Sequence, residues 1–373
     1  MYTPKPPLSH SRLWVHINHI EHNLNYFRSF LQPTTKLMAL VKANGYGLGA
    51  VGLSRQLERL HLADMLGVAS PYEGIELRKA GITLPIMVLT PGFGAFPDLI
   101  DCQLEPEIQN FEALHAYTFA AKERGLTGVP FHIALDSGMH RVGFEPAHIP
   151  ELIKYLKNNP YIIPKSVFSH LAAADEAVHD AFTQSQIDLF DTMSSQLCNA
   201  LPHQMMRHIL NSAGTERFAH AQFDMVRIGI GMYGTSAVDS NLLRHPCSLE
   251  CPIIQIKEIP FGDTVGYGRQ GKTPDGPKRI ATLPIGYADG VDRRLSKGVG
   301  RFLVNGALVP TIGNICMDMC MVDIGNVEAK VGDTVTLFGG APALTAIEWA
   351  HTLGTISYEI YTSISQRVQR NYA

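Results

Sequence analysis

The stretch that decides the fold reads Ala39-Leu40-Val41-Lys42-Ala43-Asn44-Gly45-Tyr46-Gly47-Leu48-Gly49. An apolar run, typical of a buried strand, leads directly into a lysine and then into a glycine-rich turn. Burial at a strand end disfavours the charged form of Lys42, and a neutral amine can attack a carbonyl. The backbone N–H groups of the turn could hold a phosphate. Together these features suggest pyridoxal phosphate, although a snorkelling lysine before an ordinary loop explains this segment alone equally well.

Short apolar runs alternate with helical patterns through the first two thirds of the chain. Eight strands, most with room for a helix before the next strand, predict a (β/α)8 TIM-like barrel over residues 1–240. An open doubly wound sheet is the alternative, and the fourth strand is weak enough to be a loop. The predicted strands are Met38–Ala43, Met65–Ser70, Ile86–Thr90, Leu104–Ile108, Phe131–Asp136, Ser166–Leu171, Met205–Asn211 and Met225–Ile230. The clearest predicted helices are Glu112–Arg124, Ile149–Asn158 and Glu176–Leu197.

The pattern changes near Asn241, within a polar segment, 235–244, that could link two domains. Strands then follow strands, which predicts a C-terminal, mainly antiparallel β domain over residues 241–373 and an α/β fold class for the whole chain. Asn305-Gly306, between two apolar runs, indicates a hairpin, and one helix is expected at Ala343–Leu353. The strands expected here are Ile253–Ile259, Ile280–Ile285, Phe302–Val304, Ala307–Pro310, Met319–Asp323 and Thr334–Phe338.

The composition limits the classes of function. The chain has 373 residues, of which 45% are hydrophobic and 17% charged, so it can bury a large core and form two domains. A net charge of −3 without a basic stripe argues against nucleic acid as the main partner. No apolar stretch is long enough to span a bilayer, and the start of the chain lacks the apolar core of a signal peptide. These features predict a cytoplasmic protein without a membrane partner.

Polar residues stand where the predicted barrel strands end, and barrels of this kind place their reacting groups there. They are Lys42, Arg141, His170, Ser212 and Arg227. Any one of them taken singly is more often a satisfied structural residue, but five that converge would each need a partner. Loops after the last two strands of such barrels often bind phosphate, so Ser212 and the N–H groups near Gly229 and Ile230 are candidates for that task.

A series of motifs links these residues to a known family. The motifs are Val41–Gly47, Asp136–Gly143, Asn211–Ala213, Arg227–Gly234, Val265–Gly268, Gly286–Gly290, Cys316–Asp318 and Ser357–Glu359. In this order they resemble the alanine racemase family, whose members are pyridoxal-phosphate enzymes with a barrel and a C-terminal β domain. The resemblance covers most of the chain. It implies an isomerase that interconverts L-alanine and D-alanine by a two-base mechanism and supplies D-alanine for peptidoglycan.

The resemblance also implies a role for each matched residue. Lys42 would hold pyridoxal phosphate as a Schiff base and act as one base, while Tyr267 from the partner subunit of a homodimer would be the second. Arg227 would face the pyridine nitrogen, with His208 supporting it and His170 joining the hydrogen-bond chain near Tyr267. The phosphate would be bound by Tyr46, Ser212, Gly229, Ile230 and Tyr358. The substrate carboxylate would be bound by Arg141 and Met317, with Tyr287 at the entrance and Asp318 in a supporting role.

Some positions depart from the family pattern. Ala134 stands where many relatives carry a carbamylated lysine that braces the substrate-binding arginine. Arg141 must then be held by something else, either a bound anion or another side chain. Gly45, Leu48 and Asn314 also differ from the residues usual in the family.

Rival classes of function remain open at this point. The segment 47–52 satisfies the dinucleotide fingerprint, which makes a nicotinamide oxidoreductase a competing class. Against it, no acidic residue ends the next predicted strand, and eight strands exceed the six of that fold. Two C-x₃-C pairs, Cys247/Cys251 and Cys316/Cys320, could bind zinc, although buried strand cysteines explain them better and no metal is expected. A non-catalytic pyridoxal-phosphate carrier or a decarboxylase would share the barrel and lysine, whereas Tyr267 and the second domain favour a racemase.

Overall fold

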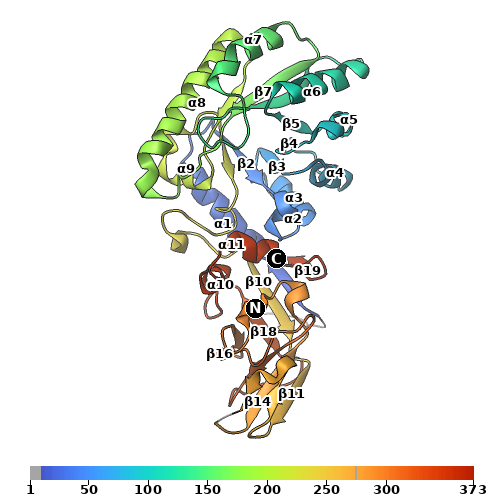
Figure 1. The fold of residues 1–373 in the computed structure, drawn as a ribbon, viewed down its shortest axis with the longest axis vertical. Helices are drawn as coiled ribbons and strands as arrows, with labels where there is room; N and C mark the ends of the chain where they lie inside the picture. Colours follow the sequence, from blue (N-terminus) through green and yellow to red (C-terminus); the bar gives the residue numbers. More distant parts are fainter. Residues whose placement is uncertain (1–9, 274) are drawn as a thin grey trace. The chain divides into compact units, whose positions relative to one another are not determined.

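The computed structural model describes residues 10–273 and 275–373 (Figure 1). The chain divides into two compact units. We call residues 20–45 and 50–244 the barrel unit, and residues 10–19, 46–49 and 245–373 the C-terminal unit. Two short segments, 10–19 and 46–49, therefore group with the C-terminal unit, although both precede the boundary predicted at residue 240.

Eight strands form the sheet of the barrel unit in the order β8-β7-β6-β5-β4-β3-β2-β9, and all neighbours are parallel. Its two ends meet through backbone hydrogen bonds of 3.0 Å from Asp224 N to Arg207 O and from Arg227 N to Leu210 O. The ring is thereby nearly closed, which confirms the predicted barrel and excludes the open sheet. The strands are β2 (Lys36–Leu40), β3 (Met65–Val68), β4 (Ile86–Val88), β5 (Glu105–Ile108), β6 (Val129–Ala134), β7 (Ile162–Phe168), β8 (Met206–His208) and β9 (Met225–Ile228).

Helices separate most of these strands and bury one face each. In α3 the buried residues are Ala50, Leu53, Ser54 and Leu57, which follow the three- and four-residue spacing of a single helix face. The long helix α8 begins four residues later than predicted, because a 3₁₀ turn at Ala177–His179 precedes it. The helices are α1 (Ile17–Arg28), α3 (Ala50–Arg59), α4 (Pro71–Lys79), α5 (Phe96–Asp101), α6 (Phe111–Glu123), α7 (Ile149–Lys157), α8 (Asp180–Ala200) and α9 (Ser212–Arg217).

The C-terminal unit contains a six-stranded sheet of order β16-β15-β18-β10-β1-β19, together with sheets β11-β14-β17 and β12-β13. Every pairing is antiparallel except that of β1 with β19, which confirms a mainly antiparallel domain. The strands are β1 (Arg12–Val15), β10 (Cys247–Pro252), β11 (Gln255–Ile259), β12 (Thr264–Val265), β13 (Gly271–Lys272), β14 (Lys278–Leu283), β15 (Arg301–Val304), β16 (Ala307–Pro310), β17 (Cys320–Asp323), β18 (Thr334–Phe338) and β19 (Gln369–Tyr372). The helices are α10 (Ala346–Leu353) and α11 (Ser357–Thr362).

Of two sequence predictions in this unit, a hairpin and a strand, the first is confirmed and the second is wrong in part. The Asn305-Gly306 hairpin is confirmed, since Val304 pairs with Ala307 and the two turn residues have φ angles of 43° and 87°. The single strand expected at Ile253–Ile259 is wrong at its start. There β10 ends at Pro252 in the large sheet and β11 begins at Gln255 in the three-stranded sheet.

Neither a membrane-spanning helix nor a cluster of metal ligands occurs in the described part of the chain. Within residues 10–273 and 275–373, no helix is long and apolar enough to cross a bilayer. Over the same ranges, no group of three or more His, Cys, Asp or Glu residues could hold a metal ion. Cys247 and Cys251 are buried on β10, and Cys320 is buried on β17.

Candidate active site

Lys42 begins a left-handed turn just after β2. The predicted strand continued to Ala43, but β2 ends at Leu40. The φ angles are 52° at Ala43, 54° at Asn44, 62° at Gly45 and 51° at Tyr46. This conformation is costly for residues other than glycine and asparagine, and such strain concentrates at functional sites where the surroundings fix it. The turn closes through a hydrogen bond of 2.8 Å from Gly45 N to Val41 O.

The carboxylate of Glu73, on α4, fixes this turn. Its Oε1 accepts a hydrogen bond from Ala43 N at 2.6 Å, and its Oε2 accepts from Ala69 N at 2.7 Å and Ser70 N at 3.0 Å. Glu73 thus joins the residue after Lys42 to the end of the neighbouring strand. Sequence reasoning missed Glu73, although the spacing from Ser70 to Glu73 is that of a capping box and could have revealed it.

The amine of Lys42 lies in an environment that disfavours its charge. Burial has the largest effect in lowering the pKa of Lys42, and the charges of Arg141 and Arg227 lower it further while Glu73 opposes them. A neutral amine is therefore more available here than on a free lysine. This fits the imine-forming role predicted for Lys42.

Arg227 is a deeply buried charge, with 4% of its surface exposed. Its Nη1 donates to His208 Nδ1 at 2.8 Å, and its Nη2 donates to Ser169 O at 2.7 Å and to His170 Nδ1 at 3.2 Å. Burial lowers the pKa of Arg227 to about 10, so the guanidinium stays charged at neutral pH. Burial, reinforced by the charge of Arg227, lowers the pKa of His170 to about 3 and that of His208 well below its usual value.

Glu107, on β5, is a buried carboxylate that the sequence reasoning did not single out; 4% of it is exposed. It pairs in register with His132, two residues before Ala134 on the same face of β6. Burial raises the pKa of Glu107 to about 8, and the charges of Arg141 and Arg227 act against this rise. Glu107 is thus an acidic neighbour of the exposed Arg141, beside the strand on which Ala134 departs from the family pattern.

The predicted phosphate-binding residues of the barrel unit lie together after β8 and β9. The Ser212 hydroxyl accepts hydrogen bonds from Gly229 N at 3.1 Å and Gly231 N at 3.2 Å. A Cβ added to Gly231 would lie 2.2 Å from the ring of Phe27, so glycine is required there. A turn of N–H groups, a guanidinium and an amine of lowered pKa match the phosphate, pyridine and aldehyde of pyridoxal phosphate, so the residues present fit this cofactor.

The segment 46–49 is held by the end of the chain, within the C-terminal unit. Arg370 Nη2 donates to Gly47 O at 2.8 Å, and the Tyr372 hydroxyl lies 3.0 Å from both Leu48 O and Gly49 O. A Cβ on Gly47 would lie only 1.9 Å from Tyr361 O. These glycines therefore serve a close approach of the backbone. In the same unit the rings of Tyr46 and Tyr358 lie 5.9 Å apart, which brings two predicted phosphate ligands together.

The other candidate residues of the C-terminal unit stand on neighbouring loops. Tyr267 is 73% exposed, and its backbone oxygen accepts a hydrogen bond from Asn314 Nδ2 at 3.0 Å. Tyr287 N donates to Cys316 O at 3.0 Å, next to the half-exposed Met317. The carboxylate of Asp318 accepts from Arg367 Nη2 at 2.6 Å. Asn314, a departure from the family pattern, thus holds the loop of Tyr267.

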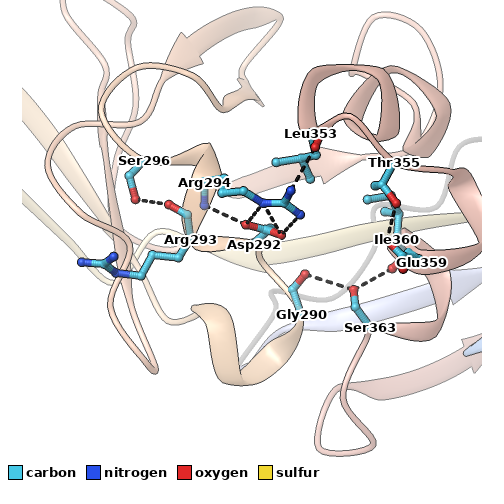
Figure 2. Close-up of polar contacts among 10 residues, drawn as sticks. All are labelled: Gly290, Asp292, Arg293, Arg294, Ser296, Leu353, Thr355, Glu359, Ile360 and Ser363. Carbon is cyan, nitrogen blue, oxygen red and sulfur yellow. Dashed lines mark hydrogen bonds and ion pairs between the residues drawn. The ribbon is translucent and has the colours of Figure 1, made fainter.

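A hollow of about 510 Å³ opens in the C-terminal unit, and Tyr287 is one of the residues that line it. Figure 2 shows the Arg294 guanidinium against the Asp292 carboxylate, whereas the Arg293 side chain extends away from them. Arg294 Nη2 lies 2.7 Å from the Asp292 carboxylate, and its Nη1 donates to Leu353 O at 3.0 Å. Glu359 accepts a hydrogen bond from the Thr355 hydroxyl. Since Arg294 and Asp292 neutralise one another, the barrel site is the better candidate for the chemistry, and the hollow belongs to the surroundings of Tyr287.

Comparison with known proteins identifies the family. The family model described as alanine racemase, N-terminal domain, matches residues 15–237, and that described as alanine racemase, C-terminal domain, matches residues 247–372. The chain belongs to the alanine racemase family. The alanine racemase of Desulfovibrio desulfuricans is 36% identical over 96% of each chain, and that of Cutibacterium acnes is 39% identical over 90% of each chain.

Solved structures of the alanine racemase family agree with this assignment. Alanine racemase from Clostridium difficile superposes with a TM-score of 0.91 at 35% identity, covering 100% of this chain and 97% of that one. The enzyme from Streptomyces lavendulae gives a TM-score of 0.90 at 32% identity, covering 99% and 98% of the two chains. Membership of the alanine racemase family confirms the resemblance seen in the sequence and removes the nicotinamide oxidoreductase from consideration.

Proposed function

We propose that this chain interconverts L-alanine and D-alanine with pyridoxal phosphate as its cofactor. One observation carries the proposal: in the barrel unit the Lys42 amine, with its lowered pKa, has the charged groups of Arg227 and Arg141 as electrostatic neighbours. An amine that can form an imine, a guanidinium suited to a pyridine and a second guanidinium suited to a carboxylate are what amino-acid racemisation on this cofactor requires. Family membership supports the same activity.

The residues that the family resemblance names would bind the cofactor. When bound, pyridoxal phosphate supplies an aldehyde for the imine and an electron sink that acidifies the Cα–H bond of the substrate. Lys42 would provide the amine, and the segment of Ser212, Gly229 and Ile230 would bind the phosphate together with Tyr46 and Tyr358. Arg227 would face the pyridine nitrogen. Because a guanidinium only donates hydrogen bonds, it would keep that nitrogen unprotonated and moderate the electron sink.

Racemisation needs one proton acceptor on each face of the substrate Cα. The Lys42 amine would serve one face. Tyr267 would serve the other face as a phenol or phenolate. Arg141 and the backbone N–H of Met317 would bind the substrate carboxylate, with Tyr287 narrowing the entrance and Asp318 supporting that loop through Arg367.

A second copy of the chain completes this proposal. Tyr267 would reach the barrel of the partner subunit in a head-to-tail homodimer, so each active site would contain residues of both chains. The exposure of Tyr267 supports this arrangement, because it leaves the phenol accessible to another subunit. We expect the enzyme to work in the cytoplasm and to supply D-alanine for peptidoglycan.

The test is an assay of D/L interconversion with purified protein and pyridoxal phosphate, over a panel of amino acids that includes alanine and serine. Lys42→Ala should abolish both racemisation and the visible absorption band of the bound cofactor. Lys36→Ala, at the exposed start of β2, is the matched control and should retain both. A wild-type protein that binds the cofactor through Lys42 but leaves every amino acid of the panel unracemised would defeat the proposal.

A further inference from the structure

A line of hydrogen bonds crosses the interior of the barrel unit from its surface to Arg227. We call these six side chains the barrel relay: Lys165, Glu105, His132, Ser166, His208 and Arg227. Lys165 Nζ donates to Glu105 Oε1 at 2.5 Å, and Glu105 Oε2 lies 2.9 Å from His132 Nε2. The Ser166 hydroxyl lies 2.6 Å from His132 Nδ1 and 2.9 Å from His208 Nε2. Arg227 Nη1 lies 2.8 Å from His208 Nδ1.

For a neutral His132, the chemistry of Arg227 and of Glu105 gives a direction to each bond between them in the barrel relay. A guanidinium can only donate, so His208 Nδ1 accepts from Arg227 and the ring proton of His208 sits on Nε2, facing Ser166. A carboxylate can only accept, so His132 carries a proton on the Nε2 that faces Glu105. Between the two imidazoles, the hydroxyl of Ser166 accepts a hydrogen bond from His208 Nε2 and donates one to His132 Nδ1. Ser166 is therefore the residue on which the continuity of the relay depends.

The surroundings of His208 and of Glu105 set the charge states of these two side chains. Burial, aided by the charge of Arg227, keeps the pKa of His208 well below its usual value, so this imidazole is neutral. Burial favours a raised pKa for Glu105, but hydrogen bonding to His132 and Lys165 outweighs it, and the pKa of Glu105 is lowered. The ring of Phe168 stacks on that of His208 at 5.1 Å and 9°, which holds the imidazole in its orientation.

We infer that Ser166 is a positioning residue whose hydroxyl couples the Glu105 carboxylate to Arg227, and thereby fixes the guanidinium that faces the cofactor. This inference rests on the proposed function, because it gives Arg227 that task. Ser166 is fully buried and lies on β7 in register with His132 on β6. Without its hydroxyl, the Nε2–H of His208 loses its acceptor, and the influence of the carboxylate ends at His132. The His208 ring, whose Nδ1 accepts from the guanidinium, would then lack the hydrogen bond that fixes its tautomer.

The experiment compares the holoenzyme with Ser166→Ala and with Ser54→Ala. Ser54 is a matched control because it is fully buried in the same unit and, among the described residues, its hydroxyl has no hydrogen-bond partner. Ser166→Ala should lower kcat about tenfold with KM changed less than about twofold, the loss expected for one buried hydrogen bond that acts through Arg227. It should also weaken cofactor affinity and shift the pH midpoint of the visible absorption of the bound cofactor. Ser54→Ala should resemble the wild type in all four measurements.

Two results would overturn the inference. The first is a Ser166→Ala protein that melts earlier but keeps the wild-type kcat, cofactor affinity and absorption titration, because its hydroxyl would then be structural only. The second is an equal effect of Ser54→Ala. Should Ser166→Ala fail to fold, Glu105→Gln keeps an acceptor for His132 without the charge, and an unshifted absorption titration in that variant would overturn the inference as well.

The same measurements separate this inference from the proposed function. A wild-type protein that binds pyridoxal phosphate but does not racemise alanine would defeat the proposed function alone. Cofactor affinity and the absorption titration need no turnover, so they would still decide whether Ser166 acts through Arg227.

Discussion

Arg227 in the barrel unit is 4% exposed and donates to two imidazoles and three backbone carbonyls, whereas Tyr267 in the C-terminal unit is 73% exposed. The charge and direction of Arg227 are set by its own chain. Among the described residues, Asn314 donates its hydrogen bond to the backbone oxygen of Tyr267 and not to its phenol. The barrel residues are therefore preorganised, while the phenol depends on what approaches its surface. Substitutions in the barrel should alter stability and chemistry together, but a substitution of Tyr267 should alter chemistry alone.

The largest expected effect comes from Tyr267→Phe. Loss of one acid–base group should reduce racemisation by about 10³-fold. The melting temperature should stay within about 1 °C of the wild type, since exposed substitutions barely affect stability. Exchange of the substrate Cα proton with solvent, measured from L-alanine and from D-alanine, should fall far more in one direction than in the other. Tyr72→Phe, at a tyrosine that is 76% exposed on α4, is the control. Equal losses in both directions would contradict the assignment of two different bases.

Glu107→Gln tests the barrel side of the comparison through pH. Burial raises the pKa of Glu107 in the folded state to about 8, above its ordinary value of 4.5, so the native protein retains a proton that the unfolded chain releases. The contribution of this proton to the free energy of unfolding is fully present below pH 4.5, and it is lost as the pH rises from there through 8. Between pH 6 and pH 8 the wild type should lose about 2 kcal/mol from this source. The glutamine stays neutral, so the variant should lack this loss.

Thermal unfolding of the two proteins at pH 6, 7 and 8 measures that difference. Glu112→Gln, at an acidic residue in the first turn of α6, provides the matched control and should keep the wild-type pH profile. Parallel profiles for the wild type and Glu107→Gln would show that the guanidinium groups of Arg141 and Arg227 keep Glu107 ionised throughout.

Glu73→Gln should have the next largest effect, since three backbone N–H groups share its carboxylate. The amide offers one acceptor oxygen and turns two donors towards those N–H groups, so we expect a loss of about 2 kcal/mol in stability. Because the Ala43 N–H follows Lys42 directly, cofactor affinity should fall as well. Glu76→Gln, at an exposed position of the same helix, should change neither property. Unchanged cofactor affinity in Glu73→Gln would mean that the left-handed turn holds Lys42 without this anchor.

Features that depend on residues close together in the sequence were predicted correctly, whereas features that depend on residues far apart in the sequence were missed. Alternating apolar runs revealed the eight barrel strands, and Asn305-Gly306 revealed the hairpin, because both signals are local. The strand β1 was missed, since its place between β10 and β19 depends on segments more than 200 residues away. The strand of Glu105 and Glu107 resembled a loop, because acidic side chains are unusual on a buried strand. Glu105 is explained only by its partners His132 on β6 and Lys165 on β7, which the sequence does not place beside it.

The candidate site shows the same division. The family resemblance named Lys42, Arg227 and His208, and the structure places Arg227 against His208. The residues that hold these groups were not recognised, because no motif joins Ser166 to His132 or Arg370 to Gly47. Such contacts arise from strand register and from the closing of the chain ends, which a single sequence does not display.

Tyr372→Phe gives the smallest expected effect and tests how far the chain end controls the segment 46–49. The hydroxyl serves Leu48 O and Gly49 O, while Arg370 holds Gly47 O independently, so removal of the hydroxyl should cost about 1 kcal/mol. For a chain of this size that is a fall of about 2 °C in the melting temperature. Cofactor affinity should weaken only slightly, because Tyr46 keeps its contact with Tyr358. Tyr72→Phe is again the control. A loss of cofactor affinity as large as that of Glu73→Gln would show that the segment 46–49, like Arg227, is preorganised by hydrogen bonds of its own chain. The contrast between the two units would then hold for the phenol of Tyr267 alone.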